Sequence, residues 1–305
     1  MQEVYDMSWC NTENTAVALG YFDGVHVAHQ YLINMMGDYA VKNNLKKAVF
    51  TFTKSIKLGH KGKDILSLPQ KLLCMRELGI DLFYSPDFSD FSQLTPEEFV
   101  LDVLINSMGA KAVFCGENFF FGKNRSGDVS VLQRLCSEYG IAFIKAPTLN
   151  QDGEVVSSSA IRLALENGNI EKANKMLGRP YSIDFCVVHG KKLGRTIGTP
   201  TINQIYPANM CYPKEGVYLS CTTVDEKKYP SATGFGTRPT VNGVGLTSET
   251  YIKGFDGDLY YRNIKVEFFA YLFAPQKFDD LSQLSAMILL SADKAEEYLK
   301  ENALI

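Results

Sequence analysis

The chain has 305 residues, of which 46% are hydrophobic and 21% are charged, and its formal net charge is −3. This length suits two ordinary domains, each with its own core, and the composition is that of a globular protein. The charge balance argues against a binder of nucleic acid, which needs a basic face, and no apolar run reaches the about 18 residues of a membrane-spanning helix.

The seven cysteines are scattered, odd in number and never spaced as Cys-x-x-Cys. This pattern is typical of reduced cysteines in a core rather than of a disulfide framework or a metal site. The first residues lack the basic and apolar regions of a signal peptide. We therefore expect a cytoplasmic protein without a membrane partner, and the sequence leaves its oligomeric state open.

The first motif in the chain is the tight loop Gly20-Tyr-Phe-Asp-Gly-Val-His-Val-Ala-His29. It lies between an apolar, strand-like run at 15–19 and a segment with helical spacing, so a strand feeds a helix here. The first N–H groups of a helix are unpaired and favour an anion, and Gly20 and Gly24 allow the backbone to approach a ligand. His26 and His29, three positions apart, face the same side. They are either solvated surface histidines or a phosphate site, and we favour the latter.

Short β-rich runs then alternate with helical patterns, at 47–52, 80–84, 111–115 and 141–146. Thr95 and Glu98 form the signature of a capping box and predict a helix over 96–108. Strands that alternate with helices indicate parallel βαβ units. The pattern predicts a doubly wound, Rossmann-like sheet of about five strands, with ligands beyond the carboxyl ends of the strands.

Two aromatic segments follow predicted strand ends. One is Gly116-Glu-Asn-Phe-Phe-Phe-Gly122, and the other is Asp87-Phe-Ser-Asp-Phe91. Three adjacent phenylalanines are costly to leave in water. They either plug the end of the sheet or form a pocket that stacks on a ring-shaped ligand.

A second phosphate motif is Val156-Ser-Ser-Ser-Ala-Ile-Arg162. Serines before an apolar helical run act as N-caps. Ser158 and Ser159, together with free amides and the Arg162 guanidinium, also converge where a triphosphate can bind.

The helical pattern breaks at Leu177-Gly-Arg-Pro180, so we place a domain boundary between residues 179 and 180. The following runs are strand-like and separated by glycine- and proline-rich turns, at 183–189, 216–224, 232–236, 248–253 and 264–272. They predict a small antiparallel β-barrel over 180–305. A final amphipathic helix, about 280–302, should pack across it with its Leu and Met stripe as core.

The segment 189–203 of this second domain is rich in glycine and in basic residues, and we expect it to be a loop. It is either a solvated basic turn or a cradle for phosphates. Thr201 and Asn203 offer two neutral oxygens to a Mg²⁺ ion that takes its other ligands from phosphates and water. The candidate phosphate contacts are Gly190, Lys192, Gly194, Arg195 and Gly198.

These motifs resemble a known family. The first loop is similar to Gly-x-Phe-Asp-Gly-x-His-x-Gly-His of bacterial FAD synthetases, with Ala28 in place of a glycine. Segments 116–122 and 157–162 resemble the family's Gly-x-Asp-Phe-x-Phe-Gly, with Asn118 for aspartate, and Ser-Ser-Thr-x-Ile-Arg, with Ser159 for threonine. Segment 198–203 resembles Gly-x-Pro-Thr-Ala-Asn of riboflavin kinases, and segments 235–240, 249–252 and 255–260 extend that match.

The resemblance implies a bifunctional enzyme: ATP phosphorylates riboflavin to FMN in domain 180–305, and a nucleotidyltransferase domain, 1–179, joins AMP to FMN to give FAD. It implies that His26 and His29 stabilise the α-phosphate and that Glu249 takes the proton of the riboflavin 5′-hydroxyl. It also implies Mg²⁺ at both sites, with Thr201 and Asn203 as ligands in the kinase. The implied nucleotide contacts of the first domain are Gly20, Phe22, Asp23, Gly24, Ser158, Ser159 and Arg162. The implied flavin contacts are Asn118, Phe119 and Arg238, and Phe88 and Phe91, which follow a predicted strand end, are further candidates to line a flavin site.

Three alternatives stay open. Ala28 and Asn118 depart from the family pattern, so the first domain could be a weak or inactive adenylyltransferase beside a working kinase. The chain could also be a non-catalytic flavin sensor, or a nucleotidyltransferase for another phosphate ester. Arg238 could be structural or adjacent to a phosphate, and Glu249 alone could be a surface charge.

Overall fold

The computed structural model describes residues 1–52, 63–190, 193–240, 243–277 and 280–305, so the predicted phosphate contact Lys192 lies outside the described residues. The chain forms two compact units, Met1–Ser158 and Ser159–Ile305. The functional boundary at residues 179 and 180 stays a prediction.

The first unit contains a six-stranded parallel sheet in the order β1-β4-β3-β2-β5-β6. The doubly wound sheet is thus confirmed, with one strand more than expected. The additional edge strand has only three residues, too few to show a pattern. The strands are β1 (Gln2–Val4), β2 (Thr15–Leu19), β3 (Lys46–Phe50), β4 (Leu82–Tyr84), β5 (Ala110–Gly116) and β6 (Ala142–Ala146).

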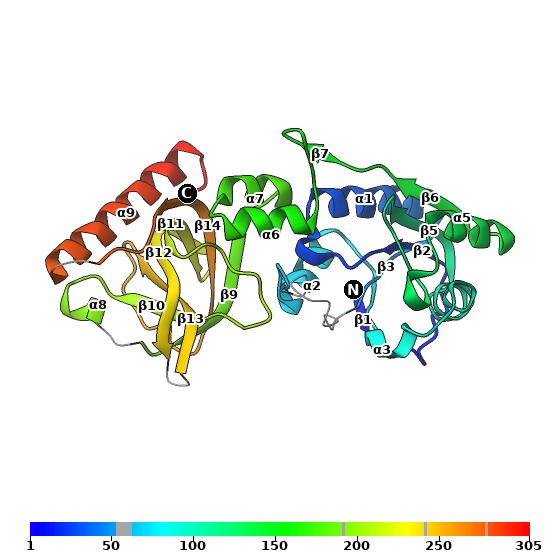
Figure 1. Ribbon diagram of the computed structural model, residues 1–305, viewed down its shortest axis with the longest axis horizontal. Helices are drawn as coiled ribbons and strands as arrows, with labels where there is room; N and C mark the ends of the chain where they lie inside the picture. The colour runs from blue at the N-terminus through cyan, green and yellow to red at the C-terminus, as the bar shows by residue number, and fades with distance from the viewer. Residues whose placement is uncertain (53–62, 191–192, 241–242, 278–279) are drawn as a thin grey trace. The chain divides into compact units, whose positions relative to one another are not determined.

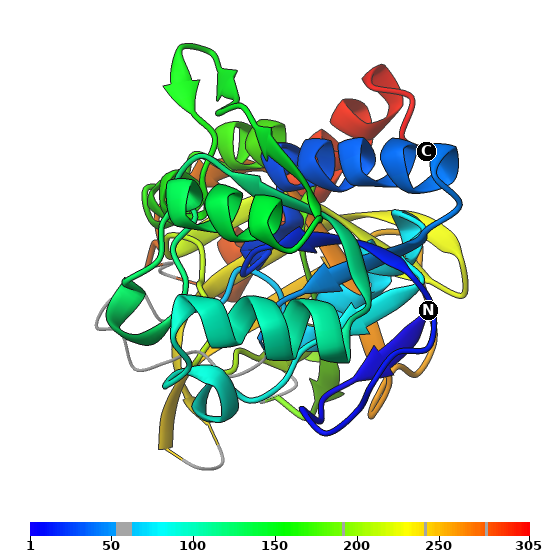
Figure 2. The same ribbon diagram turned by 90° about the vertical axis from the view of Figure 1, so that its right-hand side faces the viewer.

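Both faces of this sheet are covered by helices (Figure 2). Side chains alternate along β2, so Ala16 and Ala18 pack on one side while Val17 and Leu19 pack on the other. Helices α1 (Val27–Lys42) and α2 (Leu68–Glu77) cover the first side, and η3 (Phe99–Ser107) and α5 (Val129–Glu138) cover the second. Burial on both faces explains why the strands are almost continuously apolar in the sequence.

The helix predicted over 96–108 begins as expected but changes its winding. Thr95 and Glu98 form the capping box at the start of α4 (Pro96–Glu98). The chain then continues as the π-helix η3, in which the Met108 N–H bonds to the Val103 carbonyl five residues earlier. Propensity rules describe α-helices, so the wider turn was not predictable. The remaining short elements of the unit are η1 (Asp23–Val25), α3 (Phe88–Phe91), η4 (Lys123–Arg125), β7 (Asn150–Gln151) and β8 (Glu154–Val155).

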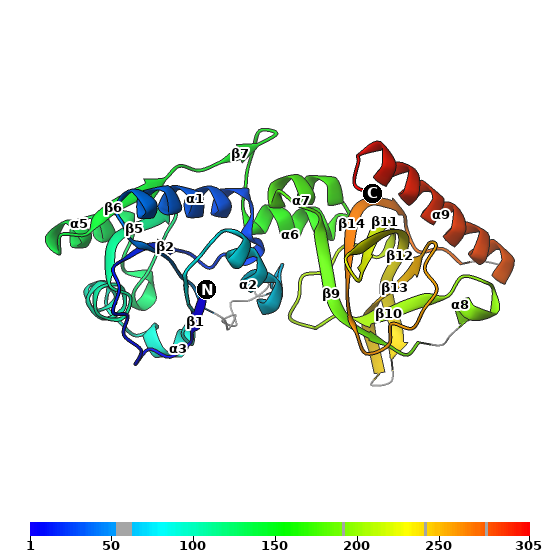
Figure 3. The ribbon, with the colours of Figure 1, turned by 180° about the vertical axis from the view of Figure 1, so that it is seen from behind.

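The second unit contains a closed antiparallel barrel in the order β10-β13-β12-β11-β14-β9 (Figures 1 and 3). The predicted barrel and terminal helix are confirmed, but β10 (Thr201–Ile205) lies where we expected a loop. The other strands are β9 (Tyr181–Val188), β11 (Gly216–Val224), β12 (Lys227–Thr240), β13 (Gly243–Ile252) and β14 (Asn263–Phe273). The helices are α6 (Ser158–Glu166), α7 (Ile170–Leu177), α8 (Leu193–Thr196) and α9 (Leu281–Glu301), which lies along the outside of the barrel.

Helix α7 is fastened to the barrel by the side chain of Asn174. Its amide nitrogen donates to the Phe268 carbonyl on β14 (2.8 Å), and its amide oxygen accepts from the Tyr181 N–H at the start of β9 (2.6 Å). One side chain therefore joins three elements.

We expect Asn174→Ala to lower the free energy of unfolding of the second unit by about 2 kcal/mol, because two hydrogen bonds are lost and a partly buried N–H is left without a partner. Chemical denaturation measures this effect. The exposed neighbour Glu171→Ala is the control and should change stability by less than about 0.5 kcal/mol. Equal stabilities of the two variants would contradict this role of Asn174.

No helix within the described ranges is both long enough and apolar enough to cross a membrane.

Candidate functional sites

The histidine loop, residues 20–29, leaves the carboxyl end of β2 through a strained turn. Phe22 and Val25 have positive φ angles of 52° and 41°, as does Gly24 with 80°. The ring of Phe22 is fully buried and packs against Gly20. A Cβ added to Gly20 would lie only 3.1 Å from this ring. We predicted Phe22 as a nucleotide contact, but its ring lies in the core and supports the loop from the protein interior. A strained loop at a strand end is typical of a binding site.

His26 and His29 lie against each other at the start of α1. Their rings stack with centroids 3.6 Å apart and an angle of 15° between planes. His26 caps the helix, since its Nδ1 accepts from the His29 N–H (3.3 Å), and the ring of Phe22 meets His29 edge-on at 5.2 Å. The prediction that both imidazoles face one side is confirmed.

His29 is held in its neutral form. Burial first, then the neighbouring His26 and then the ammonium of Lys71 lower its pKa well below the usual value of 6.5. Its Nδ1 is buried and has no hydrogen-bond partner among the described residues. A neutral imidazole carries one N–H donor and one acceptor, so His29 keeps an unused polar atom.

The second predicted phosphate motif contacts the histidine loop through Ser158, the last residue of the first unit. The Ser158 hydroxyl, at the start of α6, donates to the carbonyl of Asp23 (2.9 Å), which is 135 positions earlier in the chain. The Asp23 carboxylate is buried and accepts from the Ile65 N–H (2.8 Å). It therefore shapes the loop from inside. Ser159 and Arg162 follow Ser158 in the first turns of α6.

The predicted flavin contacts of the first unit follow two strand ends. Phe91 is only 8% exposed and packs against Phe50 (5.2 Å), so it belongs mainly to the core. Phe88 is partly buried, and Phe119 stacks on its neighbour Phe121 (5.8 Å, 16°). Asn118 is exposed in the turn after β5. Both predicted uses of these rings, as a plug and as a ligand surface, remain compatible with this placement.

In the barrel, β10 and β13 bring three predicted site residues together. Asn203 lies directly opposite Glu249, and Thr201 lies opposite Tyr251. Residues opposite each other in an antiparallel pair point to the same side, so the amide, the hydroxyl and the carboxylate share one face. The missed strand is thus the element that assembles this centre.

Gly190 lies close to this centre, and two further glycines of the segment 189–203 have their own structural reasons. An added Cβ on Gly190 would come within 2.6 Å of the Asn203 amide, and one on Gly194 within 2.2 Å of the Thr199 carbonyl. Gly198 has a positive φ of 74°. These positions therefore need glycine for close approach or for backbone conformation.

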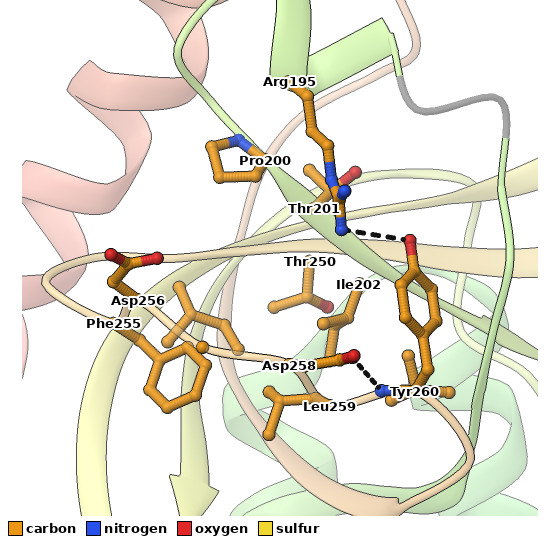
Figure 4. A pocket seen from close by; sticks show the side chains of 13 residues that line it. Arg195, Pro200, Thr201, Ile202, Thr250, Phe255, Asp256, Asp258, Leu259 and Tyr260 are labelled. Carbon is orange, nitrogen blue, oxygen red and sulfur yellow. Dashed lines mark hydrogen bonds between the residues drawn. The ribbon is translucent and has the colours of Figure 1, made fainter.

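A cavity of about 400 Å³ lies beside this segment (Figure 4). Arg195, which donates to the Tyr260 hydroxyl (3.4 Å), lines it on one side. Asp256 and Asp258 line the other, and Asp258 accepts from the Tyr260 N–H (3.0 Å). Thr201 also lines this cavity.

A second cavity, of about 560 Å³, shares Thr201 with the first and adds Glu249 and Tyr251. Helix α9 forms part of its wall through Leu284, Met287 and Ile288. Our expectation that the Leu and Met stripe is core was therefore wrong for the first half of α9, although Ala295 and Leu299 of the second half are core. Sequence periodicity gives the apolar face of a helix but not whether a cavity remains beneath it.

Arg238, the predicted flavin contact of the second domain, lies on β12, opposite Gly245 of β13.

Within the described residues, no group of three or more His, Cys, Asp or Glu side chains could hold a metal ion. The oxygens of Thr201 and Asn203 are hard ligands that suit Mg²⁺, which commonly keeps water and substrate phosphates in its shell. These two residues fit such a shared site.

We expect the imidazole of His29 to stay neutral from pH 8 down to well below pH 6.5, because its burial, the neighbouring His26 and the ammonium of Lys71 disfavour the proton. Histidine side-chain NMR measures this titration. The unfolded chain binds this proton near pH 6.5 while the folded chain does not, so stability should fall as the pH drops below that value. A His29 that titrates at 6.5 or above would contradict the geometry.

Comparisons with known proteins give a family match for each half of the chain. Residues 9–160 match the family model for FAD synthetase, and residues 177–299 match that for riboflavin kinase. The chain is 33% identical over 301 residues to a bifunctional riboflavin kinase/FMN adenylyltransferase of Escherichia coli (strain K12), which covers 97% of this chain and 96% of that protein. It is 32% identical over 294 residues to the protein of the same description from Bacillus subtilis (strain 168), over 93% and 92% of the two chains.

A crystal structure from Streptococcus pneumoniae, described as a macrolide-efflux protein, superposes with a TM-score of 0.87 at 27% identity, over 97% of this chain and 98% of that one. The two family models follow each other along the chain, and the curated relatives match over nearly their whole length. The chain therefore belongs to the family of bifunctional riboflavin kinase/FMN adenylyltransferases.

Proposed function

We propose that this protein makes FAD from riboflavin in two steps: it transfers the γ-phosphoryl group of ATP to riboflavin, and then the AMP group of a second ATP to FMN. The observation that carries the proposal is the β10–β13 register, which sets Asn203 against Glu249 where two cavities share Thr201. The stacked histidines of the first unit supply the second centre.

In the kinase step, the two cavities divide the substrates. The cavity with Arg195 has a cationic side chain beside the glycine-rich segment and suits the nucleotide. The larger cavity is mostly apolar, includes the side chains of α9, and suits the flavin ring. Thr201, which lines both cavities, lies where the γ-phosphate and the riboflavin 5′-hydroxyl must meet.

Glu249 lines the flavin side of this junction. Its carboxylate accepts the proton of the 5′-hydroxyl while the hydroxyl oxygen bonds to the γ-phosphorus, the bond from that phosphorus to ADP breaks, and ADP leaves. Thr201 and Asn203 would hold Mg²⁺, which when bound neutralises phosphate charge. Glu249 orients the attacking oxygen.

In the adenylyl step, a phosphate oxygen of FMN bonds to the α-phosphorus of ATP. The bond from the α-phosphorus to the oxygen that bridges it to the β-phosphorus breaks, and pyrophosphate leaves. His26 and His29 lie at a helix start, where free N–H groups favour the phosphates. Since His29 is neutral, it donates a hydrogen bond and not a full charge. Ser158 ties the loop to α6, and Ser159 and Arg162 hold the leaving phosphates.

Asp23 keeps the loop in shape, and Asn118, Phe88 and Phe119 are the proposed flavin contacts of this domain. We also propose a cytoplasmic location, which suits the seven free cysteines.

Two variants test the assignment together. Glu249→Gln should lower the rate of FMN formation from riboflavin, ATP and Mg²⁺ by about a hundredfold or more, because the proton acceptor is lost. The same variant should form FAD from FMN and ATP at the wild-type rate. His29→Ala should show the reverse pattern.

Each variant is thus the folding control of the other. If neither reaction occurs in the wild type, the chain is a flavin binder. If FMN forms but the FAD rate equals that of His29→Ala, the first domain is inactive and the adenylyl assignment is wrong.

Gly190→Ala should impair only the kinase. The new Cβ would lie 2.6 Å from the Asn203 amide, so the proposed metal ligand must move. We expect the kcat of FMN formation to fall at least about tenfold, since a small displacement at a reacting centre has large effects. FAD formation from FMN should stay unchanged.

The matched control is Gly37→Ala, where the added Cβ would find only the Lys47 side chain at an ordinary 3.8 Å. Gly37→Ala should keep both rates. A Gly190→Ala enzyme with wild-type kinase activity would show that Asn203 need not hold its observed position.

A further inference from the structure

Lys71 is a buried cation behind the histidine loop. It lies on α2 and its side chain is only 7% exposed, which is unusual for lysine. No carboxylate among the described residues lies within ion-pairing distance of it, although Asp23 and Asp64 act on it from further away. A buried charge without a direct counter-ion is costly, so it calls for an explanation other than stability.

The ammonium of Lys71 contacts Tyr21 of the histidine loop. Its Nζ donates to the Tyr21 carbonyl (3.1 Å) and lies 4.6 Å from the centre of the Tyr21 ring. The Tyr21 hydroxyl in turn donates to Asp64 (2.6 Å). Tyr21 directly precedes Phe22, the ring that supports His29. The ammonium thus fixes the point at which the loop turns toward the histidines.

The same carbonyl has a second, uncharged donor. The buried Thr51, after β3, donates its hydroxyl to Tyr21 O at 2.9 Å. The carbonyl would therefore keep a hydrogen bond without Lys71. What only Lys71 adds is a positive charge close enough to act on His29.

We propose that Lys71 is a positioning residue for adenylyl transfer, whose ammonium holds the Tyr21 carbonyl and places a fixed positive charge behind the loop that receives the phosphates of ATP. This inference rests on the proposed function of the first domain. A preorganised charge in a dry site is worth more than one in water, because little solvent screens it.

Lys71→Met and Thr51→Val separate the charge from the hydrogen bond, since each removes one donor to the same carbonyl. Lys71→Met should lower kcat/KM for ATP in FAD formation by about tenfold or more, whereas Thr51→Val should lower it by less than about threefold. FMN formation by the same samples should stay at the wild-type level.

A second readout reports the charge directly. The pKa of His29, followed by histidine NMR, should rise toward 6.5 in Lys71→Met and stay in place in Thr51→Val, because only the first change removes a cation that acts on His29. Lys71→Gln, which keeps a donor and removes the charge, should behave as Lys71→Met does and serves if the methionine variant does not fold. Lys71→Arg should retain more activity than either.

Equal losses in Lys71→Met and Thr51→Val, or an unchanged His29 pKa in Lys71→Met, would overturn the proposal, because Lys71 would then act only as a hydrogen-bond donor to the loop. Wild-type FAD formation together with a fully active Lys71→Gln would overturn it as well. A wild type that forms FMN but no FAD would instead refute the adenylyl assignment on which the inference rests.

Discussion

The hydrogen-bond register between β10 and β13 is the constraint on which the chemistry of the barrel depends. It places an amide, a hydroxyl and a carboxylate on one face, although the carboxylate of Glu249 is 46 positions from Asn203 and 48 from Thr201. A slip of one residue would turn all of the β10 side chains to the opposite side, so Asn203 and Thr201 would leave Glu249. The closed barrel opposes such a slip because β10 also pairs with β9 on its other edge.

The first unit builds its centre by another principle. There the two histidines of the proposed adenylyl site follow a strained loop, and other residues hold the backbone of that loop: Thr51 and Lys71 bond to the Tyr21 carbonyl, and Ser158 bonds to the Asp23 carbonyl. Backbone carbonyls are thus points of attachment for the loop, and Nδ1 of His26 adds a bond inside it by accepting from the His29 N–H. The buried Nδ1 of His29 has no hydrogen-bond partner among the described residues.

The sequence predicted both architectures, because these depend on local patterns, whereas the roles of the site residues stay predictions. Short stretches of sequence show the strand-to-helix loop with its two histidines. They also show the single strands, helices and turns whose order gives the alternating first half and the turn-rich second half. Where the prediction failed, the signal was not local. Strand β10 follows glycines and a proline, so it resembled a loop, and only its partners β9 and β13 make it a strand. The α9 face resembled core, and the burial of Lys71 had no local signal, because burial and cavities arise only in the packed chain.

The central claim is that one chain carries two centres that use two different phosphorus atoms of ATP. Isotope transfer tests it most directly: the purified protein receives riboflavin, Mg²⁺ and ATP labelled at either the γ- or the α-phosphorus, and the label in the flavin products is measured by mass spectrometry. The account predicts that the FAD formed carries the γ-label in its flavin-side phosphate and the α-label in its adenosine-side phosphate. FAD without the γ-label, or γ-labelled FMN that never acquires the α-label, would contradict it.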